Sequence, residues 1–270
     1  MERVTHYGRR LPYRYSTNRS KTLRAINFAK SLRSILLPPH ELLKVYNQPF
    51  ADNILPMRIE RKQIMIRKFG TDTALLMIDV QEGVEVLKHW GGAEGRRNNP
   101  EAETHIGKLL AAWRAAELPV LYTAHDSREA ASPLKLCEPG GAFKSGLEPR
   151  AEESVFEKDV NSGFIGTSLE IDLRRRGIDR LVAVGFFTNM CVATTVRMAG
   201  NMGFDTYLVT DACACTNRVG PDGTDYDAEL VHAMTIANLH GEFCTGITTE
   251  EALGLLGADA TQMERVQGNE

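Results

Sequence analysis

The chain of 270 residues lacks the features that mark membrane and disulfide-rich proteins. It has no apolar run near the roughly 20 residues that a membrane-spanning helix needs. Its five cysteines are odd in number and show no paired spacing, which argues against a disulfide framework. Free cysteines are typical of a reducing compartment, so we expect a cytoplasmic protein without a membrane partner. Its contents of 43% hydrophobic and 25% charged residues are those of an ordinary globular protein.

Charge is distributed unevenly along the chain. Residues 1–64 contain 13 Lys and Arg against 4 Asp and Glu, a net charge of +9, whereas the remainder carries −12. We interpret residues 1–64 as a basic, irregular N-terminal extension and residues 65–260 as one folded domain. The extension is a nucleic-acid arm, a transit peptide, a segment without function, or the product of a mis-assigned start, with Met57 or Met65 as the true one. The domain has no basic patch with interleaved aromatics, so we expect no nucleic-acid partner.

From residue 73 onward, short apolar runs alternate with helical patterns. This alternation predicts a three-layer α/β/α fold with a mainly parallel sheet. Strands are predicted over 74–80, 120–123, 181–187, 206–210 and 244–248, and helices over 106–118, 169–177, 190–202, 225–241 and 250–256. In the helix over 225–241 we expect Leu230, Ala233, Met234 and Ala237 to face inward. The long segment 127–149, rich in Gly, Pro and charge, is expected to shape a binding site.

Three reactive side chains are expected at or just past the C-terminal ends of strands, where α/β sheets keep their sites. They are Asp79 in LLMIDVQ, Lys158 in FEKDVNSGFIGT and Cys191 in VAVGFFTNMCVATT. A carboxylate, an amine and a thiol at a helix N-terminus suit nucleophilic acyl transfer. The helix start is expected to lower the pKa of Cys191 below that of free cysteine. The alternatives are a small core cysteine, a loop-capping Asp79 and a surface Lys158.

The stretch VAVGFFTNMCVATTVRMAGNMGFDTYLVTDACA, with MIDVQ and K-x-x-NSGFIGT-x-L, resembles the isochorismatase-like cysteine hydrolases. This superfamily includes nicotinamidases, N-carbamoylsarcosine amidases, ureidoacrylate and biuret hydrolases, and isochorismatases. The likeness runs from about residue 66 to about residue 256. It implies the isochorismatase-like hydrolase fold, with Asp79 as general base, Lys158 as its cationic partner and Cys191 as nucleophile. It also implies an oxyanion hole from the backbone N–H groups of Phe187 and Cys191, and a cis peptide between Phe186 and Phe187.

Metal binding is the point where this chain departs from part of the superfamily. Nicotinamidases bind a divalent metal through Asp-x-His and a further His after the second strand. The matching region here, TAHDSREAASPL, holds His125 and Asp126 but no second His. One His does not make a zinc site, so we expect neither a metal nor another cofactor.

The resemblance predicts hydrolysis of a C–N bond in a small amide, ureido or carbamoyl compound through a Cys191 thioester. Two alternatives stay open: an isochorismatase-type vinyl ether hydrolase, which needs no thiol, and a non-catalytic scaffold of the same fold. Candidates to bind the small-molecule substrate mix apolar and polar groups, as ligand sites do; they are Gln81, His125, Asn161, Phe164 and Asn189. His125 as a plain loop histidine and Phe164 as a core aromatic are equally open. Because superfamily members often associate, we expect a homo-oligomer.

Overall fold

The computed structural model describes residues 68–257, and the predicted extension over 1–64 lies outside the described residues. The strands are β1 (Thr73–Ile78), β2 (Val120–His125), β3 (Ser154–Lys158), β4 (Arg180–Phe186), β5 (Asp205–Ala214), β6 (Arg218–Val219), β7 (Asp225–Tyr226) and β8 (Thr245–Ile247). The helices are α3 (Leu87–Gly91), α4 (Ala102–Ala115), α5 (Leu169–Arg175), α6 (Ala193–Asn201), α7 (Ala228–Leu239) and α8 (Thr249–Leu256). Short helical turns cover Glu82–Glu85, Pro139–Gly141 and Thr188–Val192.

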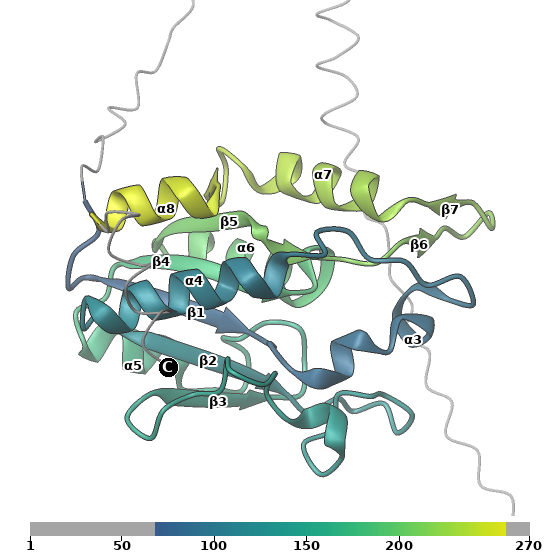
Figure 1. Cartoon of the computed structure of the whole chain (residues 1–270), viewed down its shortest axis with the longest axis horizontal. Helices are drawn as coiled ribbons and strands as arrows, with labels where there is room; N and C mark the ends of the chain where they lie inside the picture. The colour runs from purple at the N-terminus through teal and green to yellow at the C-terminus, as the bar shows by residue number, and fades with distance from the viewer. Residues whose placement is uncertain (1–67, 258–270) are drawn as a thin grey trace, which may run out of the picture. The chain divides into compact units, whose positions relative to one another are not determined.

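Six of these strands form one sheet in the order β3-β2-β1-β4-β5-β8. Every neighbouring pair in it is parallel, which confirms the predicted α/β fold class (Figure 1). Strands β6 and β7 form a separate antiparallel pair that the sequence patterns do not predict. None of the described helices is both long enough and apolar enough to cross a membrane.

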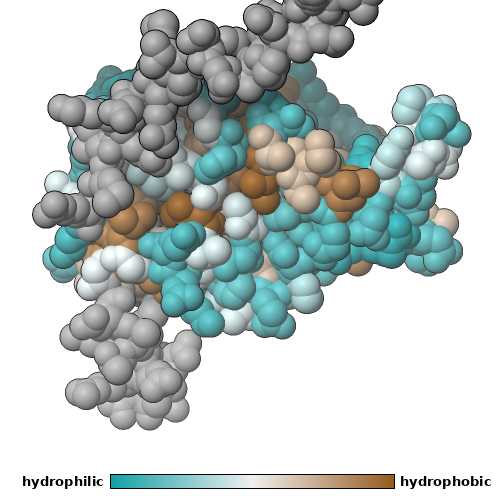
Figure 2. Space-filling model, turned by 90° about the horizontal axis from the view of Figure 1, so that it is seen from above, coloured by the Kyte–Doolittle hydropathy of each residue, from teal (hydrophilic) through white to brown (hydrophobic). Residues whose placement is uncertain are grey.

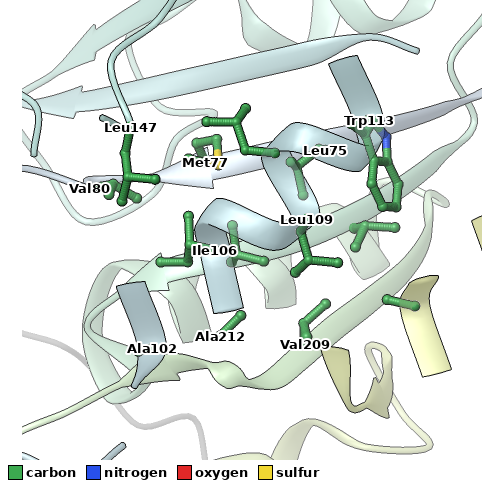
Figure 3. Packing of buried hydrophobic residues seen from close by; sticks show 14 of the residues in the cluster. Leu75, Met77, Val80, Ala102, Ile106, Leu109, Trp113, Leu147, Val209 and Ala212 are labelled. Atoms are coloured by element: carbon green, nitrogen blue, oxygen red, sulfur yellow. The ribbon is translucent and has the colours of Figure 1, made fainter. Parts of the chain in front are cut away.

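Alternate residues of each strand point to opposite sides of the sheet. Both sets are buried because helices cover both faces. On one face Leu75 and Met77 of β1 pack with apolar residues of α4 and α8. Figure 3 shows Ile106, Leu109 and Trp113 of α4 over this part of the sheet. On the other face the intervening residues of β1 pack with apolar residues of α5 and α6. Covering both faces leaves the carboxyl ends of the central strands as the place for a site.

Helix α7 differs from its prediction. Residues Leu230, Ala233, Met234 and Ala237 were expected inside, but all four are exposed, and the buried residues are Ala228, His232 and Leu239. Apolar side chains occur on all sides of α7, so their spacing does not single out one face. A hydrogen bond between His232 Nδ1 and the Thr188 hydroxyl, 2.9 Å long, accompanies the observed orientation.

Candidate active site

Asp79 comes directly after β1, at a point where the backbone leaves the sheet. Its φ of 52° lies in the left-handed region, which is uncommon for a residue with a side chain. The neighbouring strand β4 approaches very closely here. A Cβ atom added to Gly185 would lie only 2.0 Å from the Ile78 carbonyl oxygen. The buried carboxylate accepts hydrogen bonds on both oxygens, from Thr123 Oγ1 at 2.6 Å and from Lys158 Nζ at 2.6 Å. Asp79 is therefore held at the end of β1 by side chains from β2 and β3.

Lys158 is the last residue of β3, and its side chain is fully buried. Its ammonium contacts Asp79 Oδ2 at 2.6 Å, His125 Nδ1 at 2.8 Å and the Val160 carbonyl oxygen at 3.2 Å. These three acceptors match the three protons that a lysine ammonium donates. A charge in this position is tolerated because its carboxylate partner is buried with it.

His125 ends β2 and faces the ammonium with its Nδ1 atom. Burial and then the charge of Lys158 lower the pKa of His125, so its ring is neutral at pH 7. A neutral ring that accepts at Nδ1 carries its proton on Nε2. His125 thus completes a polar cluster with Asp79 and Lys158 without adding a charge to it.

Cys191 lies in the turn Thr188–Val192, a single π-helical turn that leads directly into α6. The sequence predicts an α-helix that starts near residue 190. In the structure the first turn is instead a wider, π-helical turn, and the α-helix begins at Ala193. The N–H groups on either side of Cys191, those of Met190 and Val192, both donate to the Phe187 carbonyl, at 2.9 and 3.3 Å. The predicted cis peptide between Phe186 and Phe187 is confirmed at the end of β4.

The expected low pKa of Cys191 is wrong in direction. Burial, and then the negative charge of Asp79, raise the pKa of this thiol well above its usual value, and Lys158 offsets only part of the rise. The prediction considered the helix N-terminus and omitted the loss of solvent around a buried sulfur. Cys191 is therefore a neutral thiol at rest.

The thiol, the carboxylate, the amine and the imidazole meet at one point. Cys191 Sγ lies 3.7 Å from His125 Nδ1, and that nitrogen lies 3.7 Å from Asp79 Oδ2. A carboxylate oxygen of Asp79, a ring nitrogen of His125 and the sulfur of Cys191 all lie within 4.8 Å of one another. Such a cluster can bring a proton acceptor to a thiol, as nucleophilic catalysis requires.

The same cluster does not fit a divalent metal. Asp79 Oδ2 and His125 Nδ1, its oxygen and nitrogen ligand atoms, both accept hydrogen bonds from Lys158 Nζ. An ammonium therefore already lies where a metal ion would bind. Asp126, the remaining acidic candidate, uses Oδ1 to accept from the Leu136 N–H at 3.1 Å. The donor set therefore departs from a zinc site, which binds its ion through several nitrogen and sulfur ligands free to coordinate it.

A pocket of about 160 Å³ opens beside Cys191. Its apolar wall is formed by Val84, Trp90, Leu134, Phe186, Phe187 and Met190. Its polar lining is formed by His125, Ser127, Glu129, Ser132, Asn161 and Cys191. Four of these residues come from the segment 127–149, which was expected to shape a binding site. The wall and the polar groups together suit a small organic ligand.

The substrate-binding candidates divide between the pocket and its surroundings. His125 and Asn161 line the pocket. Phe164 lies in the core, stacked on Phe204 with ring centroids 5.9 Å apart. Gln81 is fully buried, and its amide exchanges hydrogen bonds with the His125 backbone at 2.8 and 3.3 Å. Asn189 is outside the lining, and its Oδ1 is buried without a hydrogen-bond partner among residues 68–257.

Thr123 is the residue that sequence reasoning missed. It lies opposite Ile78 in the β1–β2 pairing, and its Oγ1 donates to Asp79 Oδ1. The same oxygen accepts from the Asp79 N–H at 3.2 Å. The available signal was a hydroxyl inside an otherwise apolar strand, because a buried hydroxyl needs a partner.

Fold and site together define an α/β protein with a buried cysteine close to a buried carboxylate at the end of the central strands. A model of the isochorismatase domain matches residues 73–251. The isochorismatase family protein YrdC of Bacillus subtilis is 41% identical over 67% of this chain and 94% of its own length. A solved structure of an isochorismatase family protein from Chromobacterium violaceum is 42% identical, with a TM-score of 0.66, and covers 71% of this chain and 97% of its own. The chain belongs to the isochorismatase family of hydrolases.

One relative carries a specific activity in its name. The ureidoacrylate amidohydrolase RutB of Acinetobacter baylyi is 29% identical over 172 residues, which is 52% of this chain and 70% of that protein.

Proposed function

We propose that the chain is a cysteine hydrolase that cleaves the C–N bond of a small amide, ureido or carbamoyl compound through a Cys191 thioester. The observation that carries the proposal is the meeting of Cys191 Sγ with the Asp79–Lys158–His125 cluster at the wall of the pocket. The activity named for RutB belongs to this class of reaction.

In the first half-reaction Asp79 takes the thiol proton while Cys191 Sγ bonds to the substrate carbonyl carbon. The C=O π pair moves to the oxygen, which the N–H groups of Phe187 and Cys191 stabilise. The pair returns, the C–N bond breaks, and the leaving amine takes the proton from Asp79. Between these steps Lys158, whose Nζ lies 2.6 Å from Asp79 Oδ2, balances the charge of the carboxylate.

In the second half-reaction a water molecule attacks the thioester carbonyl and gives a proton to Asp79. The C–S bond breaks, and the sulfur recovers that proton. The product acid leaves, and Asp79, Lys158 and Cys191 are back in their starting protonation states. Because the resting thiol is neutral, the mechanism depends on the adjacent base.

Acid-quench mass spectrometry during turnover of a panel of small amides and ureas tests the proposal. We expect an acyl adduct that maps to Cys191 and disappears as the substrate is consumed. Amide or urea turnover that survives in Cys191→Ala would contradict the thiol mechanism. Turnover of vinyl ethers in place of amides and ureas would favour the isochorismatase-type reaction, which needs no thiol. Absence of both turnover and adduct across amides, ureas and vinyl ethers would favour a non-catalytic scaffold.

We further propose that the reaction is metal-independent. The support is the ammonium of Lys158, which occupies the donor atoms of Asp79 and His125. Activity is expected to be unchanged after dialysis against a chelator. Loss of activity that zinc or iron restores would contradict this proposal and favour a nicotinamidase-type site.

We also propose that the protein acts in the cytoplasm as a homo-oligomer. Two apolar side chains of α7 support an association surface. Leu230 and Met234 lie one helical turn apart, and their exposed fractions are 50% and 53%. Figure 2, which views the molecule from the side of α7 and α8, shows hydrophobic surface among hydrophilic surface. Sedimentation velocity at micromolar concentration should show a species larger than 30.0 kDa. A monomer alone would contradict it.

A further inference from the structure

The charge of the pocket separates possible substrates into classes. Among the described residues, the lining contains one acidic side chain, Glu129, and neither lysine nor arginine. The Glu129 side chain is 64% exposed and lies 3.8 Å from His89 at the mouth. A substrate carboxylate entering here would approach a negative charge and would find no cation in the lining. Its loss of hydration would therefore go uncompensated.

Lysine and arginine side chains beside the lining residues are already engaged. Lys158 has three acceptors within 3.2 Å, and His125 is neutral because burial and Lys158 lower its pKa. Arg128 extends to Asp159, whose Oδ2 accepts from its Nε at 2.8 Å. Lys135 donates to the Ser127 carbonyl. A substrate carboxylate would have to break one of these contacts to gain a partner.

The size of the pocket adds a second limit. About 160 Å³ is close to the volume of an engineered cavity that accommodates benzene, roughly 150 Å³. Its polar groups are neutral hydroxyls, an amide and an imidazole, apart from Glu129 at the mouth. This lining suits an amide or urea group at Cys191 with a short arm toward the mouth.

We propose that the pocket takes a small amide or urea that is uncharged or positively charged and discriminates against ureido acids and other carboxylates. The proposal rests on the proposed function, because it concerns the same site. It separates this chain from a hydrolase of ureidoacrylate, which bears a carboxylate.

Two matched series of compounds on the full-length protein provide the test. The amides are succinamate, 4-hydroxybutanamide and 4-aminobutanamide, and the ureas are 3-ureidopropionate, (3-hydroxypropyl)urea and (3-aminopropyl)urea. Ammonia release gives kcat/KM, and protection of Cys191 against iodoacetamide gives a dissociation constant with or without turnover. We expect the neutral and cationic members to have a kcat/KM about tenfold higher and a dissociation constant about tenfold lower than the carboxylates, a modest factor because a mouth charge is partly screened.

The variant Glu129→Gln should narrow the gap between carboxylate and neutral members by roughly threefold, as loss of one half-screened charge does. Glu242→Gln, an exposed carboxylate outside the lining, is the matched control and should leave the gap unchanged. Tightest binding of the carboxylates in the unmodified protein would overturn the inference. So would an equal effect of both variants. If neutral members protect Cys191 best but none is turned over and no adduct forms, the inference stands and the proposed function fails.

Discussion

Cys191 and Cys213 are two buried thiols at the carboxyl ends of neighbouring strands. Cys213 lies in β5 opposite Gly185 of β4, and Cys191 lies in the turn after β4. Burial raises the pKa of both thiols, so neither is a thiolate at rest. Both thiols belong to the same buried apolar cluster, but only Cys191 also faces the polar cluster and the pocket.

This difference shows what makes a buried thiol reactive. Burial alone gives an inert cysteine, as for Cys213. In the proposed mechanism the adjacent carboxylate of Asp79 is the proton acceptor for Cys191, and Lys158 forms a buried ion pair with that carboxylate at 2.6 Å. On the proposed mechanism the site therefore generates its nucleophile during the reaction, and the pocket brings the substrate to the same sulfur.

Replacing the two sulfurs should give the largest contrast. Cys191→Ser is expected to lower kcat/KM by at least about a thousandfold, because an alcohol is far harder to deprotonate than a thiol. Cys213→Ala should keep kcat/KM within a few fold and lower the free energy of unfolding by about 1 kcal/mol through a small cavity. Steady-state kinetics and urea unfolding measure the two effects. Comparable losses of activity in both variants would mean that Cys191 acts only through packing.

Removing the cation should give the next largest effect. Lys158→Ala leaves a buried, unpaired carboxylate, so we expect kcat/KM to fall by at least about a hundredfold. The free energy of unfolding should fall by about 3–5 kcal/mol. Lys158→Met, which retains most of the side-chain volume, separates the charge from the cavity, and circular dichroism establishes that each variant is folded. A folded variant with near wild-type turnover would remove Lys158 from the mechanism.

Asp79→Asn should separate turnover from thiol reactivity. The charge of Asp79 helps to raise the pKa of Cys191, and that of Lys158 lowers it. The amide removes the unfavourable charge and keeps the favourable one, so the thiolate fraction at neutral pH should increase. We expect iodoacetamide to label Cys191 about tenfold faster in Asp79→Asn than in the unmodified protein, while turnover is lost.

The labelling rate should rise with pH in both proteins and reach its midpoint at lower pH in the variant. Exposed Cys137 is the internal control and should label alike in both. Slower labelling of Cys191 in Asp79→Asn would contradict the electrostatic account.

Much of the fold could be predicted from the sequence, because alternating apolar runs and helical patterns leave few arrangements for a parallel sheet. The positions of Asp79 and Cys191 followed from the same rule, since both come at the ends of central strands. Proximity to Lys158 depends on β3 lying next to β2, which only pairing across the sheet reveals. The resting pKa of Cys191 depends on burial in the assembled site, which the local sequence around a helix N-terminus does not reveal.

Side-chain orientation was the weakest part of the prediction. In α7 apolar residues occur on all sides of the helix. The buried face includes His232, which forms a hydrogen bond with Thr188 at the start of the turn Thr188–Val192. Spacing could not indicate this polar contact between distant segments. Gln81 and Phe164 likewise belong to motifs near the site but bury their side chains outside the pocket lining.

The smallest effect expected concerns Thr123, which holds the base and does not line the pocket. Thr123→Val keeps the shape but removes the donor to Asp79 Oδ1, and a hydrogen bond to a charged group contributes about 1.5–3 kcal/mol. Because Lys158 still holds Oδ2, we expect kcat/KM to fall by only about tenfold, mainly through kcat.

Thr123→Ser, which keeps the hydroxyl, should restore kcat. A purely structural role would lower kcat in both variants alike. Labelling of Cys191 should change far less than in Asp79→Asn, because the charge beside the sulfur is retained.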